Sequence, residues 1–583
     1  MKSIKILNTS LFLSVLTVLF FSFTSNSRFV SEIKAEGQPD NIPWEFWQPE
    51  GPDTRQLVTL SPDLFEGYVE GFRHDWDLLE QSGTATGINS IDYLKQTMYV
   101  QNDLAFEWMK RNIPYFDCPD KEFMEIYYYR HWMNRLHLKN NGKNFVVTEF
   151  IGKVNWGDRY NVINCPAGHQ FNWLMWLDDP VYAHSYMDYY MYSPEAKPKL
   201  FRDWYADCTY RINQIHPSKP FVENVLEGLK RSFHSYDSNK VPEFFDMYWC
   251  NDWNDGFERT IGGSGIRTTI NSYMYGNAVG ISKLAGFISD VPTQNKYKRI
   301  ADTIKSNVQS HLWDDETKFF KTYKNQAGYE KDTSMYGKEE WFIAQPVGQL
   351  VDVMEATGYI PWQFNLPDDE PEFAKAWKRI NDSKSGFKAA NGLAGAQKDH
   401  PRYNLPTPGA RWNGLAWFYA ETQTLEGLAN LLNNYNQDVV GKEDYFEVLE
   451  RYTKMGHYNV YPNGSEVRPY GTEWVDPDKL NEHGRPVRST ILHYFHSGYT
   501  DLIINGLVGV RAQDDNSLIV NPLVPKGKWD YFCLDGLKYK ERIICIIWDK
   551  NGNKYGKGAG LRVFADGTEK VFRKDLGKLV INL

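Results

Sequence analysis

Residues 248–259 hold the densest group of side chains that could do chemistry. The segment reads Tyr-Trp-Cys-Asn-Asp-Trp-Asn-Asp-Gly-Phe-Glu-Arg, so Asp252, Asp255 and Glu258 lie among aromatic rings that include Trp253. A carboxylic acid beside apolar rings is destabilised in its charged form, which raises its pKa towards the range that a general acid needs. The glycines in and after the segment favour the wall of a pocket, although a surface loop whose acids cap the next helix is the alternative.

A second group of this kind occurs late in the chain, at residues 467–477. Glu473 lies there between Gly471 and Trp474, and Pro477 favours an extended backbone. Two carboxyl groups on either side of the scissile bond are the usual means of cleaving a glycosidic bond. Taken singly, Glu473 is also typical of an ordinary loop glutamate.

Two further segments resemble pocket walls. Trp412, Asn413 and Gly414 come at the start of a predicted helix, where the amide of Asn413 and the helix N-terminus could donate hydrogen bonds to hydroxyl groups. Trp362 lies in a loop of aromatic and amide residues, 359–365. Each segment could instead belong to the core.

The composition favours a sugar as the ligand. Aromatic residues make up 15% of the chain, with 20 Trp and 37 Tyr, and these two types suit a place that is apolar on one side and wet on the other. A cleft that stacks the C–H face of a pyranose on a ring is such a place, and a large aromatic core is the alternative. The formal net charge of -9 argues against a nucleic-acid partner, which requires basic patches.

The first 27 residues have the features of an export signal. Lys2 and Lys5 precede an apolar stretch, 11–23, that is too short to span a bilayer, and no other segment is apolar enough to do so. We therefore expect a secreted or periplasmic protein with no membrane contact after signal cleavage, the alternative being a retained anchor. The six Cys form no CxxC pair, so neither a zinc site nor a disulfide scaffold is indicated.

Helical periodicity dominates the middle of the chain. No motif repeats at a fixed period, so paired helices in a ring are favoured over a solenoid. The predicted helices are 123–137, 172–192, 222–233, 269–288, 296–312, 339–357, 371–380, 412–434, 442–455 and 489–507.

After Val508 the pattern changes to short β-branched or alternating segments. Asp535-Gly536, Asn551-Gly552 and Asp566-Gly567 predict hairpin turns between them. The predicted strands are 517–520, 528–532, 537–540, 543–549, 561–564 and 570–572. We expect this antiparallel unit to pack on the helices, an independent sugar-binding module being the alternative. The predicted organisation is a signal at 1–27, a lead-in with helices at 28–120, a catalytic helical domain at 121–507 and a β unit at 508–583.

In this order, the segments 255–258, 271–275, 411–414 and 471–477 resemble the glycoside hydrolase clan of trehalase, processing α-glucosidase and mannosylglycerate hydrolase. The similarity is greatest to bacterial mannosylglycerate-hydrolase-like six-hairpin glycosidases. It implies an (α/α)6 toroid and an inverting reaction without metal or cofactor. It also implies Asp255 as general acid, Glu473 as general base, and Trp412 and Gly414 at a sugar-binding helix start.

The acid loop departs from the pattern of that clan. It reads Trp-Asn-Asp-Gly where Ser-Gly-x-Asp is usual, which leaves Asp252 and Glu258 as alternatives for the acid. The residues that select a particular sugar are not recognisable either, so the sugar and the linkage stay open.

The sequence thus predicts an exported exo-α-glycosidase that acts on oligosaccharides from polysaccharide breakdown. The carboxyl groups of Asp255 and Glu473 are expected to lie roughly 6.5–9.5 Å apart, as inversion requires. There are two alternatives. One is a polysaccharide lyase on a helical toroid, in which arginines bind a uronate, and the other is a non-catalytic glycan-binding protein. The residues predicted to contact substrate are Trp253, Glu258, Trp362, Trp412, Asn413, Gly414 and Trp474.

Overall fold

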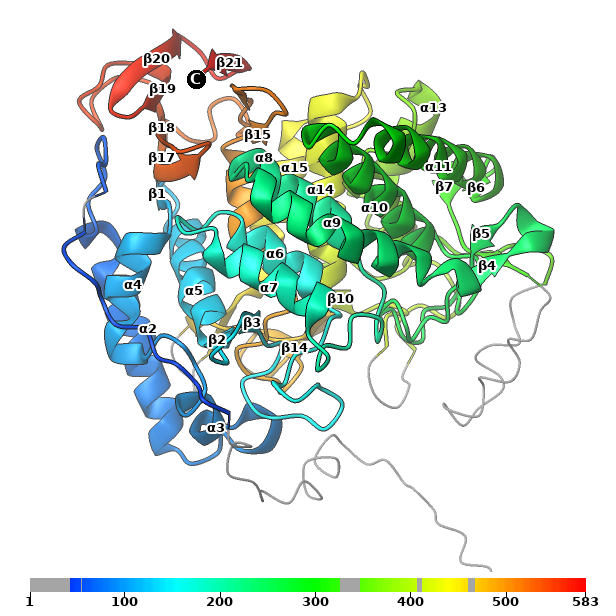
Figure 1. Ribbon diagram of the computed structural model, residues 1–583, viewed down its shortest axis with the longest axis horizontal. Helices are drawn as coiled ribbons and strands as arrows, with labels where there is room; N and C mark the ends of the chain where they lie inside the picture. Colours follow the sequence, from blue (N-terminus) through cyan, green and yellow to red (C-terminus); the bar gives the residue numbers. More distant parts are fainter. Residues whose placement is uncertain (1–41, 54, 326–346, 406–410, 460–466) are drawn as a thin grey trace, which may run out of the picture. The chain divides into compact units, whose positions relative to one another are not determined.

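The computed structural model describes residues 42–53, 55–325, 347–405, 411–459 and 467–583, all of which belong to one unit, Gly37–Leu583. Helices dominate up to Met455 and strands dominate from Val510 onward (Figure 1). The expected mainly α protein with a C-terminal antiparallel sheet is confirmed. Across the described ranges, no helix is both long and apolar enough to cross a membrane.

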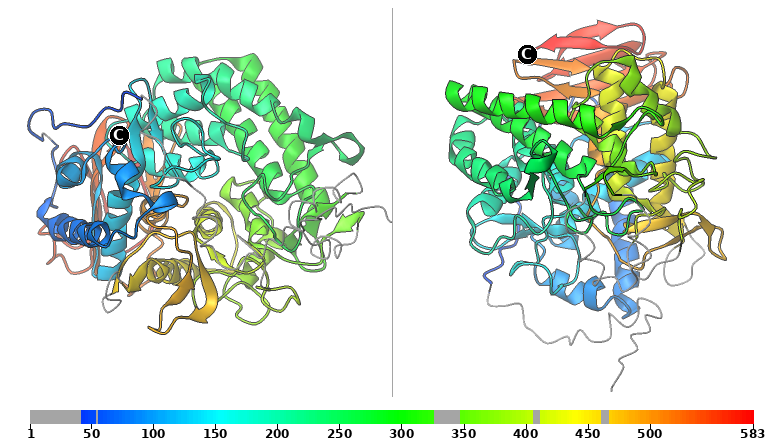
Figure 2. Two further views of the ribbon diagram at one scale, coloured as in Figure 1. Left: turned by 90° about the horizontal axis from the view of Figure 1, so that it is seen from below. Right: turned by 90° about the vertical axis from the view of Figure 1, so that its right-hand side faces the viewer.

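The central helices of this unit form a closed circuit of contacts. Each one packs against the next, and the circuit closes where the Trp173 indole donates a hydrogen bond of 3.1 Å to His131 Nδ1, which joins α6 to α5. Figure 2 shows the helices following one another in chain order around a common centre, as a helical toroid requires. In order, the circuit is α5 (Lys121–His137), α6 (Ala167–Leu174), α8 (Tyr205–Ile215), α10 (Thr268–Phe287), α12 (Ile360–Gln363), α14 (Phe418–Asn434) and α15 (Lys442–Met455).

Burial separates these helices from a second set. α10 and α14 are buried on almost every side, so their sequences show no polar stripe. Gly280 lets α8 approach α10, because a Cβ at this position would lie 2.3 Å from the backbone oxygen of Ala206. The second set packs outside and buries one face of each helix: α2 (Asp63–Gln81), α7 (Val181–Tyr192), α9 (Lys219–His234) and α11 (Val291–His311).

The C-terminal sheet takes its first strand from the other end of the chain. The strand order is β1-β17-β18-β19-β20, and β1 pairs with β17 so that Asp117 lies opposite Cys533. A smaller sheet has the order β15-β16-β21. The domain boundaries at 120 and 507 stay predictions. The strands are β1 (Tyr115–Asp117), β15 (Val510–Ala512), β16 (Ser517–Val520), β17 (Tyr531–Tyr539), β18 (Arg542–Asp549), β19 (Gly560–Ala565), β20 (Thr568–Arg573) and β21 (Leu579–Asn582).

Most predicted elements occur with small shifts of their ends. The predicted helices at 123–137, 222–233, 269–288, 296–312 and 442–455 are confirmed. The helix expected at 371–380 is a short α-helix, α13 (Pro371–Ala374), followed by a 3-10 helix, η8 (Lys375–Arg379).

Other helix predictions are wrong in part. The one for 172–192 fails between α6 and α7, where Pro180 disfavours a helical Asp179. The one for 412–434 is wrong before Phe418, because Ala416 and Trp417 form the strand β10 and pair with β13 (Trp474–Leu480). In the prediction for 339–357, residues 339–346 lie outside the described ranges, and 347–357 hold the short strand β9 (Gln349–Leu350) and the start of a 3-10 turn.

The helix predicted over 489–507 is confirmed only at its end, as a π-helical segment Leu502–Leu507. The preceding residues give their backbone N–H groups to distant partners instead of to their own chain four residues back. Leu492 donates to the Asn89 side chain, Tyr494 to the Gly471 carbonyl and Phe495 to the Glu149 carbonyl. Tertiary contacts therefore replace the helix here.

Asp535-Gly536 is a bulge inside β17, so the hairpin turn predicted there is wrong. The register shifts between Leu534 and Leu537, and Gly536 has a φ of +75°. The Asp535 carboxylate accepts backbone N–H groups of Val58, Thr59 and Leu60 at 3.0, 2.7 and 3.0 Å. The bulge thus turns a carboxylate towards the lead-in segment. Asp566-Gly567 does join β19 to β20, as predicted.

Candidate active site

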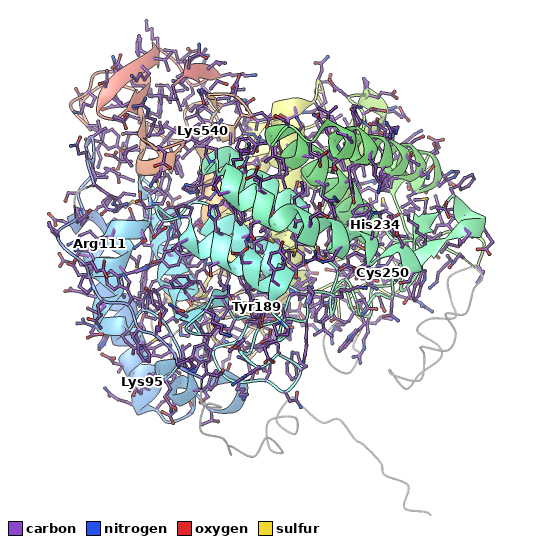
Figure 3. The ribbon with its side chains drawn as sticks, in the orientation of Figure 1. Lys95, Arg111, Tyr189, His234, Cys250 and Lys540 are labelled. Carbon is purple, nitrogen blue, oxygen red and sulfur yellow. The ribbon has the colours of Figure 1, made fainter. Side chains whose placement is uncertain are left out.

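The loop that leads into α10 positions the first group of acids. Its base is closed by Cys250 (labelled in Figure 3) and Gly265, which exchange backbone hydrogen bonds of 2.9 and 3.0 Å. Asp252 lies inside the loop and accepts the Arg259 N–H at 3.0 Å and the Ser264 hydroxyl at 3.3 Å. This carboxylate therefore holds the loop in shape.

Asp255 ties the same loop to the start of α10. Its carboxylate lies 2.6 Å from Arg267 Nε, and it also accepts the Thr269 hydroxyl and, at 3.2 Å, the Phe257 N–H. The residue is only 1% exposed, and the Arg267 side chain is fully buried. Removing one member of such a pair leaves the other buried without a counter-charge, which is strongly destabilising.

Gly256 turns the chain from Asp255 towards Glu258. Its φ of +79° lies in the left-handed region, and a Cβ here would come within 2.9 Å of Cys165 Sγ and 3.4 Å of the Trp417 ring. Glycine is the residue that meets both conditions without strain. The turn brings Glu258 out of the buried part of the loop.

Glu258 is half-buried and held by Trp412. Its Oε2 accepts the Trp412 indole N–H at 2.7 Å, and its carbonyl accepts the Trp412 backbone N–H at 3.1 Å. Burial raises the pKa of Glu258 well above its usual range, and the charges of Glu473 and Asp252 act in the same direction, against the lowering effect of the Trp412 hydrogen bond.

Trp412 begins a stack of rings that leads to the second acid. Its ring lies 3.9 Å from that of Trp417, and Trp417 lies 4.5 Å from Tyr419, both nearly parallel at 13° and 14°. Trp417 also pairs through its backbone with Trp474. Because Glu473 directly precedes this strand, the β10–β13 ladder places it beside the stack.

Glu473 is half-buried as well. Burial raises its pKa to about 7, and the Ser489 hydroxyl, 3.4 Å from Oε2, acts in the opposite direction. The His496 ring lies 3.1 Å from the Glu473 carbonyl oxygen, at hydrogen-bonding distance. Glu258 and Glu473 are thus two acids with raised pKa values that both reach the surface.

A third acid of this cluster, Glu149, was not predicted from the sequence. Burial raises its pKa to about 8, the charge of Glu473 adds to the shift, and the Tyr494 hydroxyl donates to it. Phe150 and Gly152 follow it in the sequence, a weaker version of the aromatic and glycine pattern around Asp255 and Glu473.

One thiol shows that the acids gather at one place. Burial raises the pKa of Cys165 well above its usual range, and four nearby carboxylates act in the same direction. These are Glu149, Glu258, Asp255 and Glu473. The loops before α10 and β13, which are far apart in the chain, therefore lie near one another.

Three of the predicted substrate contacts reach the surface or contact an acid, and three others are buried. Trp253 is 40% exposed, Trp474 is half-buried, and Trp412 contacts Glu258. Asn413 is fully buried, and its amide donates to the Leu405 carbonyl at 3.0 Å.

The remaining two predicted contacts serve packing. Gly414 permits close approach to Asn404, whose backbone nitrogen would lie 2.7 Å from a Cβ. Trp362 is fully buried against Phe320 and Trp377, with ring centroids 5.4 and 5.5 Å away, so it lies in the core.

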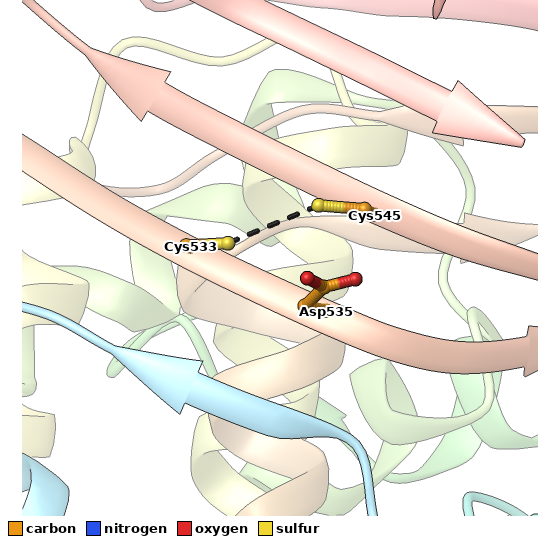
Figure 4. Close-up of side chains that lie close together, drawn as sticks. All are labelled: Cys533, Asp535 and Cys545. Carbon is orange, nitrogen blue, oxygen red and sulfur yellow. Dashed lines mark hydrogen bonds between the residues drawn. The ribbon is translucent and has the colours of Figure 1, made fainter. Parts of the chain in front are cut away.

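Cys533, Asp535 and Cys545 lie close enough together to hold a metal ion (Figure 4). The two sulfur atoms are 3.9 Å apart, and burial raises the pKa of both thiols. The Asp535 oxygens already accept backbone N–H groups from residues 58–60, so the carboxylate is satisfied without an ion. The donor set thus fits a structural anchor better than a metal centre.

A helical ring with aromatic rings and paired carboxylic acids at one end has the architecture of a glycosidase. The chain belongs to the mannosylglycerate hydrolase MGH1-like glycoside hydrolase family, whose domain model matches residues 159–497. Residues 510–571 match the C-terminal domain of glycosyl hydrolase family 65. The predicted family resemblance and the assignment as a glycoside hydrolase are confirmed, which favours hydrolysis over the lyase alternative.

The chain is also similar to proteins of solved structure. A protein described as a sialidase is 33% identical, with a TM-score of 0.77, over 90% of this chain and 45% of its own. The chain thus spans less than half the length of that relative. The GH63 mannosylglycerate hydrolase from Thermus thermophilus is 10% identical, with a TM-score of 0.46, over 65% of this chain and 99% of its own. The GH78 rhamnosidase of Bacillus sp. GL1 is 11% identical, with a TM-score of 0.47, over 78% and 41%.

Proposed function

We propose that the protein is an exported, inverting exo-α-glycosidase that acts on oligosaccharides from polysaccharide breakdown, with Glu258 as general acid and Glu473 as general base. One observation carries the choice of residues. Glu258 and Glu473 both reach the surface beside the aromatic stack, whereas Asp255 is 1% exposed and ion-paired with Arg267. Asp255, the acid expected from the family resemblance, is then a positioning residue that fixes the loop carrying Glu258.

The environments of the two acids suit different roles. Burial favours the protonated form of Glu258, which can give its proton to the departing oxygen. Glu473, with a pKa of about 7, is ionised in part of the molecules and can take a proton from the attacking water. The Trp412 indole holds the Glu258 carboxyl group in one orientation.

The rings around the acids support a sugar substrate. Trp253 is 40% exposed in the loop that carries Glu258, and Trp474 is half-buried and directly follows Glu473. Accessible indole faces can stack on the C–H side of a pyranose. Half-buried acids among rings suit the capture of one chain end, which supports exo action. Export is proposed from residues 1–27 of the sequence, which lie outside the described ranges.

Three variants test the assignment: Glu258→Gln, Glu473→Gln and Asp255→Asn. On a panel of α-linked oligosaccharides, we expect the first two to lose about 100- to 10,000-fold in kcat while remaining folded, since general acid and base catalysis each contribute that much. Asp255→Asn should chiefly lower the melting temperature, because Arg267 loses its counter-charge. Glu482→Gln, whose side chain is 86% exposed, is the matched control.

Leaving-group dependence separates the two roles. Glu258→Gln should retain most of its rate on 2,4-dinitrophenyl glycosides, whose leaving group needs no protonation, while Glu473→Gln should not. Two results together would show that Asp255 is the general acid instead. Asp255→Asn would be folded, inactive on oligosaccharides and active on the dinitrophenyl glycosides, and Glu258→Gln would be fully active. Proton NMR of the first product formed reports the anomer, and retention would contradict inversion.

A further inference from the structure

A cavity of about 680 Å³ lies at the other end of the helices from the acids. It is lined by residues from the later parts of α10 and α14, such as Val279 and Asn430, and by Arg511 of β15. Since Thr269 and Trp417 stand at the opposite ends of α10 and α14, about 20 Å of helix separates the two places. The volume falls within the range of small-molecule sites, which is about 300–1,000 Å³.

Two buried, uncharged polar side chains that line this cavity have no hydrogen-bond partner among the described residues. Gln363 is 6% exposed, and within the described residues neither its amide oxygen nor its amide nitrogen has a hydrogen-bond partner. Among the same residues, the Trp176 indole N–H, on a side chain 2% exposed, also has none. Buried polar groups are nearly always hydrogen-bonded, so these donors and the acceptor indicate a polar occupant.

The charges of the cavity are mixed. Arg211 lies 3.7 Å from Glu426 and 4.0 Å from Asp207, at ion-pair distances, and Lys283 pairs with Asp514 at 2.9 Å on the rim. The C-terminal ends of α8, α12 and α14 face the cavity with residues such as Ile215, and helix C-termini carry partial negative charge. An anion therefore gains no net attraction here.

The cavity also offers aromatic surface and side-chain amides. Tyr210, Tyr275 and Phe364 contribute rings, and Asn433 and Asn505 contribute amides. Carboxylates, amides and a guanidinium arranged around rings can bind vicinal hydroxyl groups while covering an apolar face. A neutral polyhydroxylated ligand satisfies both needs, whereas a purely apolar ligand would leave Gln363 unpaired.

We infer that this cavity is a second, non-catalytic carbohydrate site, which binds a mono- or disaccharide between the helices and the C-terminal β unit. The site does not depend on which glycosidic bond the acids cleave. It gives the β unit a part in ligand binding through Arg511, Ala512 and Lys578, all of which line the cavity.

Crystals of the full chain soaked in D-glucose, D-mannose, L-rhamnose or sucrose test the inference directly. We expect density for at least one sugar within hydrogen-bonding distance of the Gln363 amide. In titration calorimetry with that sugar, Gln363→Leu should weaken binding at this site about tenfold, because the apolar side chain removes both amide partners. The control is Gln96→Leu, an exposed glutamine outside the cavity lining.

Hydrolysis rates distinguish the proposed sugar site in the cavity from the catalytic site. Gln363→Leu should leave kcat for oligosaccharides unchanged, whereas Glu473→Gln should abolish hydrolysis and leave sugar binding at the cavity intact. If Gln363→Leu fails to fold, Lys283→Met on the rim, with a side chain 48% exposed, should lower the affinity severalfold. Sugar found only beside Glu258 and Glu473, or an affinity unchanged by these variants, would overturn the inference.

Discussion

At the scale of single residues, the two proposed catalytic acids differ in what surrounds them. Trp412 donates to Glu258 at 2.7 Å, while Glu473 has only the longer contact of 3.4 Å from Ser489. Burial is the chief cause of the raised pKa of both acids. The difference between two similar carboxyl groups is therefore set by their neighbours.

These values predict a bell-shaped dependence of kcat/KM on pH. Activity should rise as the pH increases through about 7, where Glu473 loses its proton, and fall again when Glu258 loses its own at higher pH. Initial rates from pH 5 to 10 measure both limbs. A profile that is already flat between pH 5 and 8 would show that Glu473 is not the base.

Trp412→Phe should move one limb of that profile. The indole hydrogen bond lowers the pKa of Glu258, so its loss should raise that pKa and shift the alkaline limb to higher pH, while the acid limb stays in place. Trp377→Phe, a buried substitution in the core, is the control and should shift neither limb. A shift of the acid limb alone would contradict the contact between Trp412 and Glu258.

The sequence marked this site through its crowded aromatic residues, which indicated both 248–259 and Glu473. It could not choose between Asp255 and Glu258, because their exposure depends on the turn at Gly256 and on Arg267, which is 12 residues beyond Asp255. Glu149, followed by Phe150 and Gly152, was missed because its place in the cluster depends on a contact with Tyr494, 345 positions away.

At the scale of elements, periodicity predicted long helices well and failed where other segments compete for the backbone. α10 and α15 lie almost where the pattern placed them. Residues 416–417 pair instead with 474–475, and the backbone of 492–495 bonds to three other segments. Such contacts form only in the folded chain and leave no periodic trace.

The bulge in β17 gives a testable anchor for the lead-in segment. Asp535→Asn should destabilise the protein by about 2–4 kcal/mol, because a neutral amide replaces a carboxylate that accepts the backbone N–H groups of Val58, Thr59 and Leu60. Urea denaturation followed by tryptophan fluorescence measures the loss. Asp530→Asn, which breaks a surface pair with Lys550, should cost less than about 1 kcal/mol, and equal effects would contradict the anchor.

At the scale of the whole molecule, the buried acids predict how stability varies with pH. An acid whose folded pKa is raised keeps its proton in the folded state only, so its contribution is lost as the pH rises from its unfolded value towards the folded one. Buried histidines with pKa values of about 3 have the opposite effect below pH 6.5. The acids whose pKa burial raises to about 7 or 8 are Glu149, Glu355, Glu421, Glu426 and Glu473, and these histidines are His131, His137 and His169.

We therefore expect the melting temperature to fall between pH 6.5 and 8, where the histidines no longer offset the acids. Lys139 and Lys324, whose pKa values burial lowers to about 7 and about 8, oppose this fall only from about pH 7 upward. Differential scanning fluorimetry in buffers of equal ionic strength measures the trend. Glu421→Gln should flatten it, and a melting temperature that rises steadily to pH 8 would contradict it.

The pairing of β1 with β17 has a consequence for how the chain is made. Asp535 contacts Val58 across 477 positions, and Asp117 lies opposite Cys533 in the same sheet. A nascent polypeptide cannot complete this sheet until nearly all of the chain has left the ribosome. Until then, β1 has no β17 to pair with. In the finished molecule, the same arrangement should keep the fragments together after a single proteolytic nick in an exposed middle loop.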